Sequence, residues 1–131
     1  MVHETQKIMS APTMRISATC VRVPVFRAHS EAVHIETEKK ITVEKARELL
    51  GSAAGVVVQD RREPGGYPVP KYVAKTFDTY VGRIREDISC ENGLAFWVVA
   101  DQLYKGAALN SIQIAEYLLT QEGGLRGAKK T

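Results

Sequence analysis

The chain has 131 residues, of which 44% are hydrophobic and 25% charged, and its formal net charge at pH 7 is +3. This length predicts one domain or part of one, with enough surface buried on folding for a hydrophobic core. The composition excludes a disordered tail, a collagen-like fibre and a disulfide-stabilised miniprotein. The longest uncharged apolar stretch, residues 93–100, is too short for the roughly 20 residues of a membrane-spanning helix, and no secretory signal is recognised.

The first third of the chain predicts one helix and two strands. Residues 3–10 are typical of the end of a helix, which Pro12 terminates, and a chain that starts this way is expected to be part of something longer. Residues 15–26 are rich in β-branched side chains and predict a strand, at a sheet edge or ending at Pro24. A second strand is expected over residues 32–37.

The middle of the chain predicts a short helix, a strand and a long loop. Thr42 is a suitable N-cap for a helix with one apolar face, and Gly51 suits its end. Residues 55–58 read as a buried strand. Residues 61–70 contain three prolines and two glycines, so we expect a loop. This loop is longer than the usual connection of about 4–6 residues, which suggests a binding or contact role.

The last third predicts a hairpin and a helix. Residues 79–85 and 94–100 read as antiparallel strands joined by a tight turn at Asn92-Gly93. Residues 107–121 predict a helix ending at Gly123-Gly124. The stripe expected to be buried on that helix comprises Ala108, Ile112, Ala115, Leu118 and Leu119. The whole order predicts an α+β fold, with a mostly antiparallel mixed sheet and helices packed on one face.

Composition and spacing alone give weak functional signals. No glycine-rich phosphate loop is recognised, and the three histidines share no ligand spacing, so no metal site is expected. Cys20 and Cys90 have no CxxC spacing; we expect reduced thiols, with Cys20 buried among strand neighbours. The basic residues at the C-terminal end read as a solvated tail rather than a nucleic-acid-binding arm.

Arg22 and His29 stand out in the segment between the first two expected strands. Arg22 lies in a β-branched run where an unpaired guanidinium is costly, so it needs a carboxylate from this chain or from a ligand. His29 is suited to proton transfer near neutral pH. The alternative is an internal Arg–Glu pair and a surface histidine. On a straight strand the two residues would be about 23 Å apart, so a shared site requires a bend after Pro24.

Three segments together resemble a known enzyme family. The sequence ISATCVRVPVFRAHSEAV closely resembles the active-site strand of the aspartate-β-semialdehyde dehydrogenases. The start, HETQKIM, resembles the helix just before that strand. The segment LAFWVVADQLYKGAALNSIQIAEYLL resembles the family's last hairpin strand and last helix. The resemblance covers nearly the whole chain, in register and order.

The resemblance implies a fold and a reaction. Residues 1–131 would form a single, partial C-terminal catalytic and dimerisation domain, similar to that of glyceraldehyde-3-phosphate dehydrogenase. The family reduces β-aspartyl phosphate to aspartate semialdehyde with NADPH and releases phosphate, on the route to lysine, threonine and methionine. NADP would be bound mainly by an N-terminal domain that this chain lacks, which also carries the nucleophilic cysteine; Cys20 does not match it. A cytoplasmic homodimer formed through the sheet is expected, without nucleic acid or membrane.

The family's roles carry over to four residues near the start of the chain. Arg22 matches the arginine that binds the substrate carboxylate, and His29 matches the general acid/base. Glu4 matches the glutamate that holds the substrate amino group, and Lys7 matches the lysine that binds phosphate. Glu4 and Lys7 are one helical turn apart, so both can face one site.

Two residues of the last expected helix match polar positions that approach the cofactor. These are Asn110 and, less closely, Gln113, and the alternative for both is a solvated helix face.

Three other functions are compatible with parts of the sequence. The absent nucleophile favours a non-catalytic dimerisation module for the isolated chain. A related acyl-phosphate reductase, such as the N-acetylglutamyl phosphate enzyme, fits the Arg22-to-His29 segment less well. A nucleic-acid-binding module is disfavoured because aromatic residues make up only 7% and do not interleave with basic ones.

Overall fold

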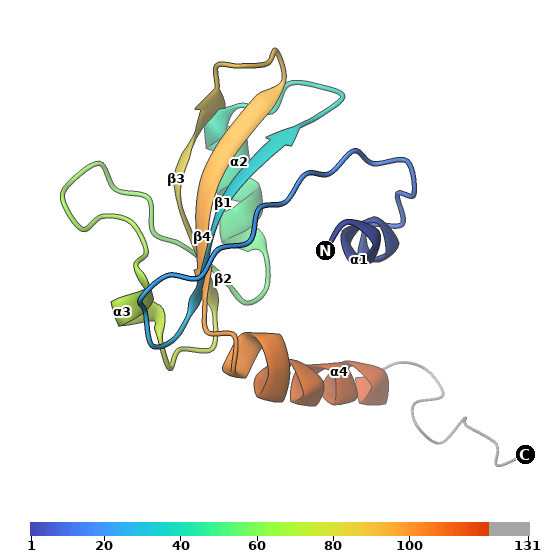
Figure 1. Ribbon diagram of the computed structural model, residues 1–131, viewed down its shortest axis with the longest axis vertical. Helices are drawn as coiled ribbons and strands as arrows, with labels where there is room; N and C mark the ends of the chain where they lie inside the picture. Colours follow the sequence, from blue (N-terminus) through green and yellow to red (C-terminus); the bar gives the residue numbers. More distant parts are fainter. Residues whose placement is uncertain (121–131) are drawn as a thin grey trace, which may run out of the picture.

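The computed structural model describes residues 1–120 and centres on one four-stranded sheet (Figure 1). Its strands are β1 (His29–Glu36), β2 (Val56–Val58), β3 (Thr79–Asp87) and β4 (Gly93–Ala100), in the spatial order β1-β4-β3-β2. β4 pairs antiparallel with both β1 and β3, whereas β2 runs parallel to β3. The expected mostly antiparallel mixed sheet is therefore confirmed.

The helices are α1 (Val2–Ile8), α2 (Val43–Ser52), α3 (Pro70–Val73) and α4 (Leu109–Thr120), with a π-helical turn, Tyr104–Ala108, leading into α4. α2 begins as expected at Thr42, whose hydroxyl oxygen accepts a hydrogen bond from the Lys45 N–H at 3.2 Å. Figure 1 shows α2 lying along the sheet, whereas α1 and α4 stand away from it. Within residues 1–120, no helix is long and apolar enough to cross a membrane.

The hydrophobic core has two parts, one on each face of the sheet. On one face, α2 contributes Ala46, which packs with Val81, Ile84 and Leu94. On the other face, Val73 of α3 packs with Ala28 and Val99, and Tyr80 and Trp97 adjoin them. The indole N–H of Trp97 donates to the carbonyl oxygen of Pro68 at 3.0 Å, which fixes the long loop against this second face. α2 and α3 thus lie against opposite faces of the sheet, whereas the sequence predicted helices on one face.

The expected strand over residues 15–26 does not form. The segment is extended but exposed, with Val21 73% and Val23 57% accessible. A strand needs a neighbour to satisfy its backbone N–H and C=O groups, and none of the described strands pairs with this segment. The expected burial of Cys20 is wrong for the same reason, because the residue is exposed. The expected burial of residues 55–58 is incomplete, since β2 lies at an edge of the sheet and Val57 is exposed.

The hairpin is confirmed, but its turn is longer than Asn92-Gly93 predicts. β3 continues to Asp87, which pairs with Gly93, so residues 88–92 form the connection. Gly93 has no positive φ. A Cβ at this position would lie 2.4 Å from Cys90 Sγ, so close packing explains the glycine. Asn92 instead holds the end of β1, because its carbonyl oxygen accepts a hydrogen bond from the N–H of Thr37, the residue after that strand.

The predicted buried stripe on the last helix is wrong for this chain. No described residue of α4 is buried, and Ile112, Leu118 and Leu119 are 56%, 43% and 64% exposed. The helix projects away from the sheet (Figure 1), so no described element covers its apolar side chains. The helix start lies at Tyr104 rather than residue 107, and the expected Gly123-Gly124 end lies outside the described residues.

Close packing at Gly82 of β3 gives a stability prediction. A Cβ at Gly82 would lie 2.2 Å from the carbonyl oxygen of Gln59 and 2.7 Å from Pro68 Cδ. We expect Gly82→Ala to lower the free energy of unfolding by about 1–3 kcal/mol, because backbone must shift to admit the methyl group. Urea denaturation measures the change.

Gly51→Ala is the matched control for Gly82→Ala. The added Cβ would meet only Val58 Cγ2, at 3.9 Å, inside helix α2. This variant should gain up to about 1 kcal/mol, because alanine favours a helix more than glycine does. Equal effects of the two substitutions would contradict the packing argument.

Candidate active site

A buried carboxylate organises the end of the sheet where β4 stops and β1 starts. Asp101 follows β4 directly and its side chain has no solvent exposure. Its Oδ2 accepts the Lys75 N–H at 2.6 Å, and its Oδ1 accepts the N–H groups of Leu103 and Tyr104 at 2.9 and 3.2 Å. Arg27 Nε lies 2.5 Å from Oδ2. Burial by itself would raise the pKa of Asp101, but the Arg27 contact and the backbone N–H groups lower that pKa to about 2.

Arg27 is held between Asp101 and an aromatic ring. Its guanidinium carbon lies 4.5 Å from the centroid of the Tyr104 ring, and that ring packs against Phe77 at 5.3 Å between centroids. The hydrogen bond to Asp101 outweighs desolvation and raises the pKa of Arg27. An internal arginine–carboxylate pair therefore forms at Arg27, a residue for which the sequence predicted none.

His29 begins β1 immediately after this ion pair. Between Arg27 and His29, the Ala28 N–H donates to Gln102 Oε1 at 2.9 Å, and Ala28 adopts a φ of 81°. A positive φ is strained for any residue with a Cβ, so distant contacts must maintain it. In the sheet His29 pairs with Ala100, and its side chain is exposed. The contacts of Asp101 and Gln102 thus set the direction of the backbone that carries the His29 imidazole.

Arg22 lies seven residues before His29 in the exposed extended segment. Among residues 1–120 it forms no ion pair with a carboxylate, so the expectation that a ligand supplies one stays a prediction. Pro24 and the turns at residues 24–27 bend the chain between Arg22 and His29, as a shared site requires.

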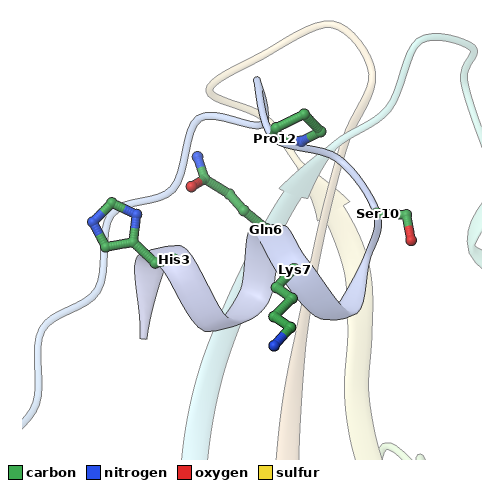
Figure 2. Close-up of a pocket in the computed structure, with 5 residues that line it drawn as sticks. All are labelled: His3, Gln6, Lys7, Ser10 and Pro12. Carbon is green, nitrogen blue, oxygen red and sulfur yellow. The ribbon is translucent and has the colours of Figure 1, made fainter.

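Glu4 and Lys7 both lie on α1 with exposed side chains. Lys7 borders a shallow depression of about 350 Å³, together with His3, Gln6, Ser10 and Pro12 (Figure 2). The amide of Gln6 donates to the carbonyl oxygen of Met14 at 2.9 Å, which folds the chain back over the helix. Glu4 Oε2 lies 3.0 Å from the amino group of Met1.

Asn110 and Gln113 lie on α4. Gln113 is half-buried and its Oε1 accepts a hydrogen bond from Lys105 Nζ at 2.8 Å, whereas Asn110 is exposed. The six candidate residues lie on three parts of the chain: α1, the segment that ends at the first residue of β1, and α4 (Figure 1). The first two parts touch, because Cys20 Sγ lies 3.1 Å from Met1 Sδ. In the part of the chain that the structure describes, no group of three or more histidine, cysteine or acidic residues is placed to hold a metal ion.

Sequence reasoning missed Asp101, Arg27 and Gln102. The Ala28–Gln102 contact spans 74 residues, so no local pattern reports it. The available signal was an acidic residue that follows an apolar strand and precedes a helix, because such a side chain can cap the helix.

The fold defines a domain of an oxidoreductase family. A family model described as "Semialdehyde dehydrogenase, dimerisation domain" matches residues 1–105, and the chain belongs to this family. Aspartate-semialdehyde dehydrogenases of Aquifex aeolicus and Synechocystis are 51% and 50% identical over 123 and 125 residues. These matches cover 94% and 95% of this chain, but only 36% and 37% of the relatives. The chain thus spans about a third of the length of the curated relatives it matches.

A solved structure agrees with this assignment. Aspartate semialdehyde dehydrogenase II from Vibrio cholerae, described as complexed with ASA, is similar with a TM-score of 0.85 and 43% identity. The match covers 91% of this chain and 35% of the Vibrio cholerae chain. The resemblance to the aspartate-semialdehyde dehydrogenases and the α+β fold expected from the sequence are both confirmed.

The depressed pKa of Asp101 gives a prediction for stability against pH. Because the folded pKa is about 2 and the ordinary value is 3.8, the ionised carboxylate stabilises the fold above pH 4. That contribution is lost as pH falls through 2. We expect Asp101→Asn to cost on the order of 3 kcal/mol at pH 7, because Arg27 loses its charged partner. Urea denaturation at several pH values between 7 and 2 measures both effects.

Asp87→Asn is the matched control. The pKa of Asp87 is also lowered, by hydrogen bonds from His34 and then Ser89, but this aspartate is only partly buried. Asp87→Asn should remove only the acid dependence that Asp87 itself contributes and keep the loss of stability that depends on Asp101, whereas Asp101→Asn should remove that loss. An unchanged acid dependence in Asp101→Asn would refute the assignment.

Proposed function

We propose that the chain is the C-terminal catalytic and dimerisation domain of an NADP-dependent aspartate-semialdehyde dehydrogenase. In this enzyme β-aspartyl phosphate is reduced to aspartate semialdehyde and phosphate is released, with the hydride supplied by NADPH. The observation that carries the proposal is the family match over residues 1–105, which contains Glu4, Lys7, Arg22 and His29 in the expected order. A cytoplasmic location, and a role in lysine, threonine and methionine synthesis, follow from the same resemblance.

The four residues have complementary chemistry for this substrate. The planar guanidinium of Arg22 can bind the α-carboxylate through two parallel hydrogen bonds. The Glu4 carboxylate holds the amino group, and the Lys7 ammonium attracts the phosphate. His29 exchanges a proton with the substrate's carbonyl oxygen as the carbon is attacked and later reduced. The start of α1 and the segment before β1 already touch, because Cys20 Sγ lies 3.1 Å from Met1 Sδ, and this contact supports a shared site.

NADP is expected to be held mainly by that remainder. The described residues of α4 fit a supporting role, because Asn110 is exposed and carries both a donor and an acceptor. Gln113 already accepts a hydrogen bond from Lys105, so its side-chain oxygen can bind the cofactor only if this hydrogen bond breaks.

A homodimer formed through the sheet is the partner we propose. The family description names a dimerisation domain, and the extended segment before β1 exposes Val21, Val23 and Phe26. Apolar side chains exposed together favour cover by another surface. A second candidate function, a dimerisation module without catalysis, is favoured because no residue of this chain matches the family's nucleophilic cysteine.

A reconstitution assay separates the two functions. The chain would be assayed alone, mixed with a separately produced nucleotide-binding part of a relative, and joined to that part covalently. The readout is phosphate-dependent reduction of NADP with aspartate semialdehyde. We expect no activity from the chain alone and activity in the mixture or the joined chain. An associated but inactive mixture, with an inactive joined chain, would favour the dimerisation module.

In the joined or full-length enzyme, His29→Ala should lower kcat by roughly 10²–10⁴-fold, because a positioned acid/base group is lost. His34→Ala is the matched control: His34 lies on the same strand and its Nδ1 is 2.8 Å from Asp87 Oδ2, in a contact unrelated to the proposed chemistry. Steady-state kinetics of both variants test the role. If His29→Ala and His34→Ala had equal turnover, His29 would not be the acid/base group.

A further inference from the structure

A second concave surface lies away from the proposed active-site residues, between α2, β3 and the loop of residues 59–69. It is an open depression with a volume of about 610 Å³, and we call it the arginine groove. Its basic lining consists of Arg47, Arg61, Arg62, Arg83 and Arg85. Two carboxylates, Asp60 and Glu63, and the ring of Tyr67 complete the polar wall. Five guanidinium groups against two carboxylates leave the groove strongly positive.

A break in the pairing of β3 with β4 places Arg83 at the groove. Gly82 pairs with Trp97 and Arg85 with Ala95, so two residues of β3 oppose one residue of β4. Such a bulge redirects the side chains at that point of the strand. Arg83 has a φ of 54°, which is strained for a residue with a Cβ. The chain therefore holds a costly backbone conformation where a guanidinium enters the groove.

The loop that forms the opposite wall is already folded. Gly82 lets the carbonyl oxygen of Gln59 approach to 2.2 Å from the position a Cβ would occupy. The amide of Gln59 donates to the carbonyl oxygens of Gly65 and Tyr67, each at 3.3 Å. The indole N–H of Trp97, on strand β4, holds the end of the loop by donating to the carbonyl oxygen of Pro68. The groove thus needs little reorganisation to bind a ligand.

The two carboxylates do not neutralise the groove. Asp60 is engaged by Arg47, at 2.7 Å, and by the Ile84 N–H, at 3.2 Å. Glu63 pairs with Arg61 at 3.2 Å. Among the described residues, the other three arginines have no acidic partner: Arg83 lies 5.8 Å from the centre of the Tyr67 ring, and Arg85 donates to the Arg83 carbonyl oxygen. Three like charges around one concavity repel each other until an anion binds.

We propose that the arginine groove binds a diphosphate group, either as free pyrophosphate or as part of a nucleoside diphosphate. Guanidinium groups present planar pairs of donors that match phosphate oxygens, and several of them favour a ligand with more than one negative charge. The volume admits two linked phosphates, and Tyr67 offers an aromatic surface beside them. This site is independent of the proposed dehydrogenase activity.

The test is isothermal titration of the 131-residue chain with sodium pyrophosphate and, separately, with ADP at low ionic strength. We expect saturable binding of at least one of these probes, with one site per chain, which weakens as salt is added. Arg83→Gly and Arg62→Ala should each weaken binding about tenfold or more, because each removes a charge-assisted contact. Arg83→Gly also relieves the positive φ, so loss of binding would not reflect backbone strain.

Arg15→Ala is the matched control, because it removes the same charge from an exposed residue outside the groove. It should leave the affinity unchanged, and circular dichroism checks that each variant is folded. The absence of saturable binding for both probes would overturn the proposal. So would equal weakening by Arg15→Ala, or weakening by Lys7→Ala with none by the groove variants. Tighter binding of ADP than of pyrophosphate would assign the nucleotide, and the reverse order would assign the free anion.

Discussion

The buried carboxylate of Asp101 holds together the segments from which the candidate active site is built. Its four partners come from the segment before β1, the second residue after α3 and the first turn beyond β4. Burying an ionised carboxylate without partners would be prohibitive, so the four contacts have to form together. Asp101 also caps the π-helical turn that leads to α4, since its Oδ1 accepts two N–H groups at the start of that turn. One residue thus joins the sheet, the approach to His29 and the last helix.

Much of the apolar surface of this chain lies outside that organised centre. Val21, Val23 and Phe26 before β1 are exposed, as are Ile112, Leu118 and Leu119 on α4. The α2 face of the sheet, by contrast, has a packed core around Val81 and Leu94. Exposed apolar surface on both flanking segments is consistent with a chain that spans about a third of its relatives' length.

The elements that sequence predicted well are those specified by neighbouring residues. Thr42 caps α2 by accepting a hydrogen bond from the N–H of Lys45, three residues later. The β3–β4 hairpin follows from two apolar strands that are close in sequence. The strand expected over residues 15–26 failed because strand formation depends on a partner, which composition does not reveal. Asp101 was missed because its contact with Arg27 joins residues far apart in sequence. The roles of Arg22, His29, Glu4 and Lys7 were reached only through the family resemblance and remain predictions.

The candidate active site and the arginine groove share one physical feature. Ala28, just before His29, and Arg83, in the groove, both adopt a positive φ although each has a Cβ. At each place a backbone N–H donates to a distant side chain. Ala28 donates its own N–H to Gln102, and Ile84, the residue after Arg83, donates to Asp60. Local conformational strain persists only where such contacts offset it. The direction of the His29 and Arg83 side chains therefore depends on residues far along the chain. A change at Gln102 would disturb the backbone before His29, and a change at Asp60, which also lines the groove, would release the backbone beside Arg83.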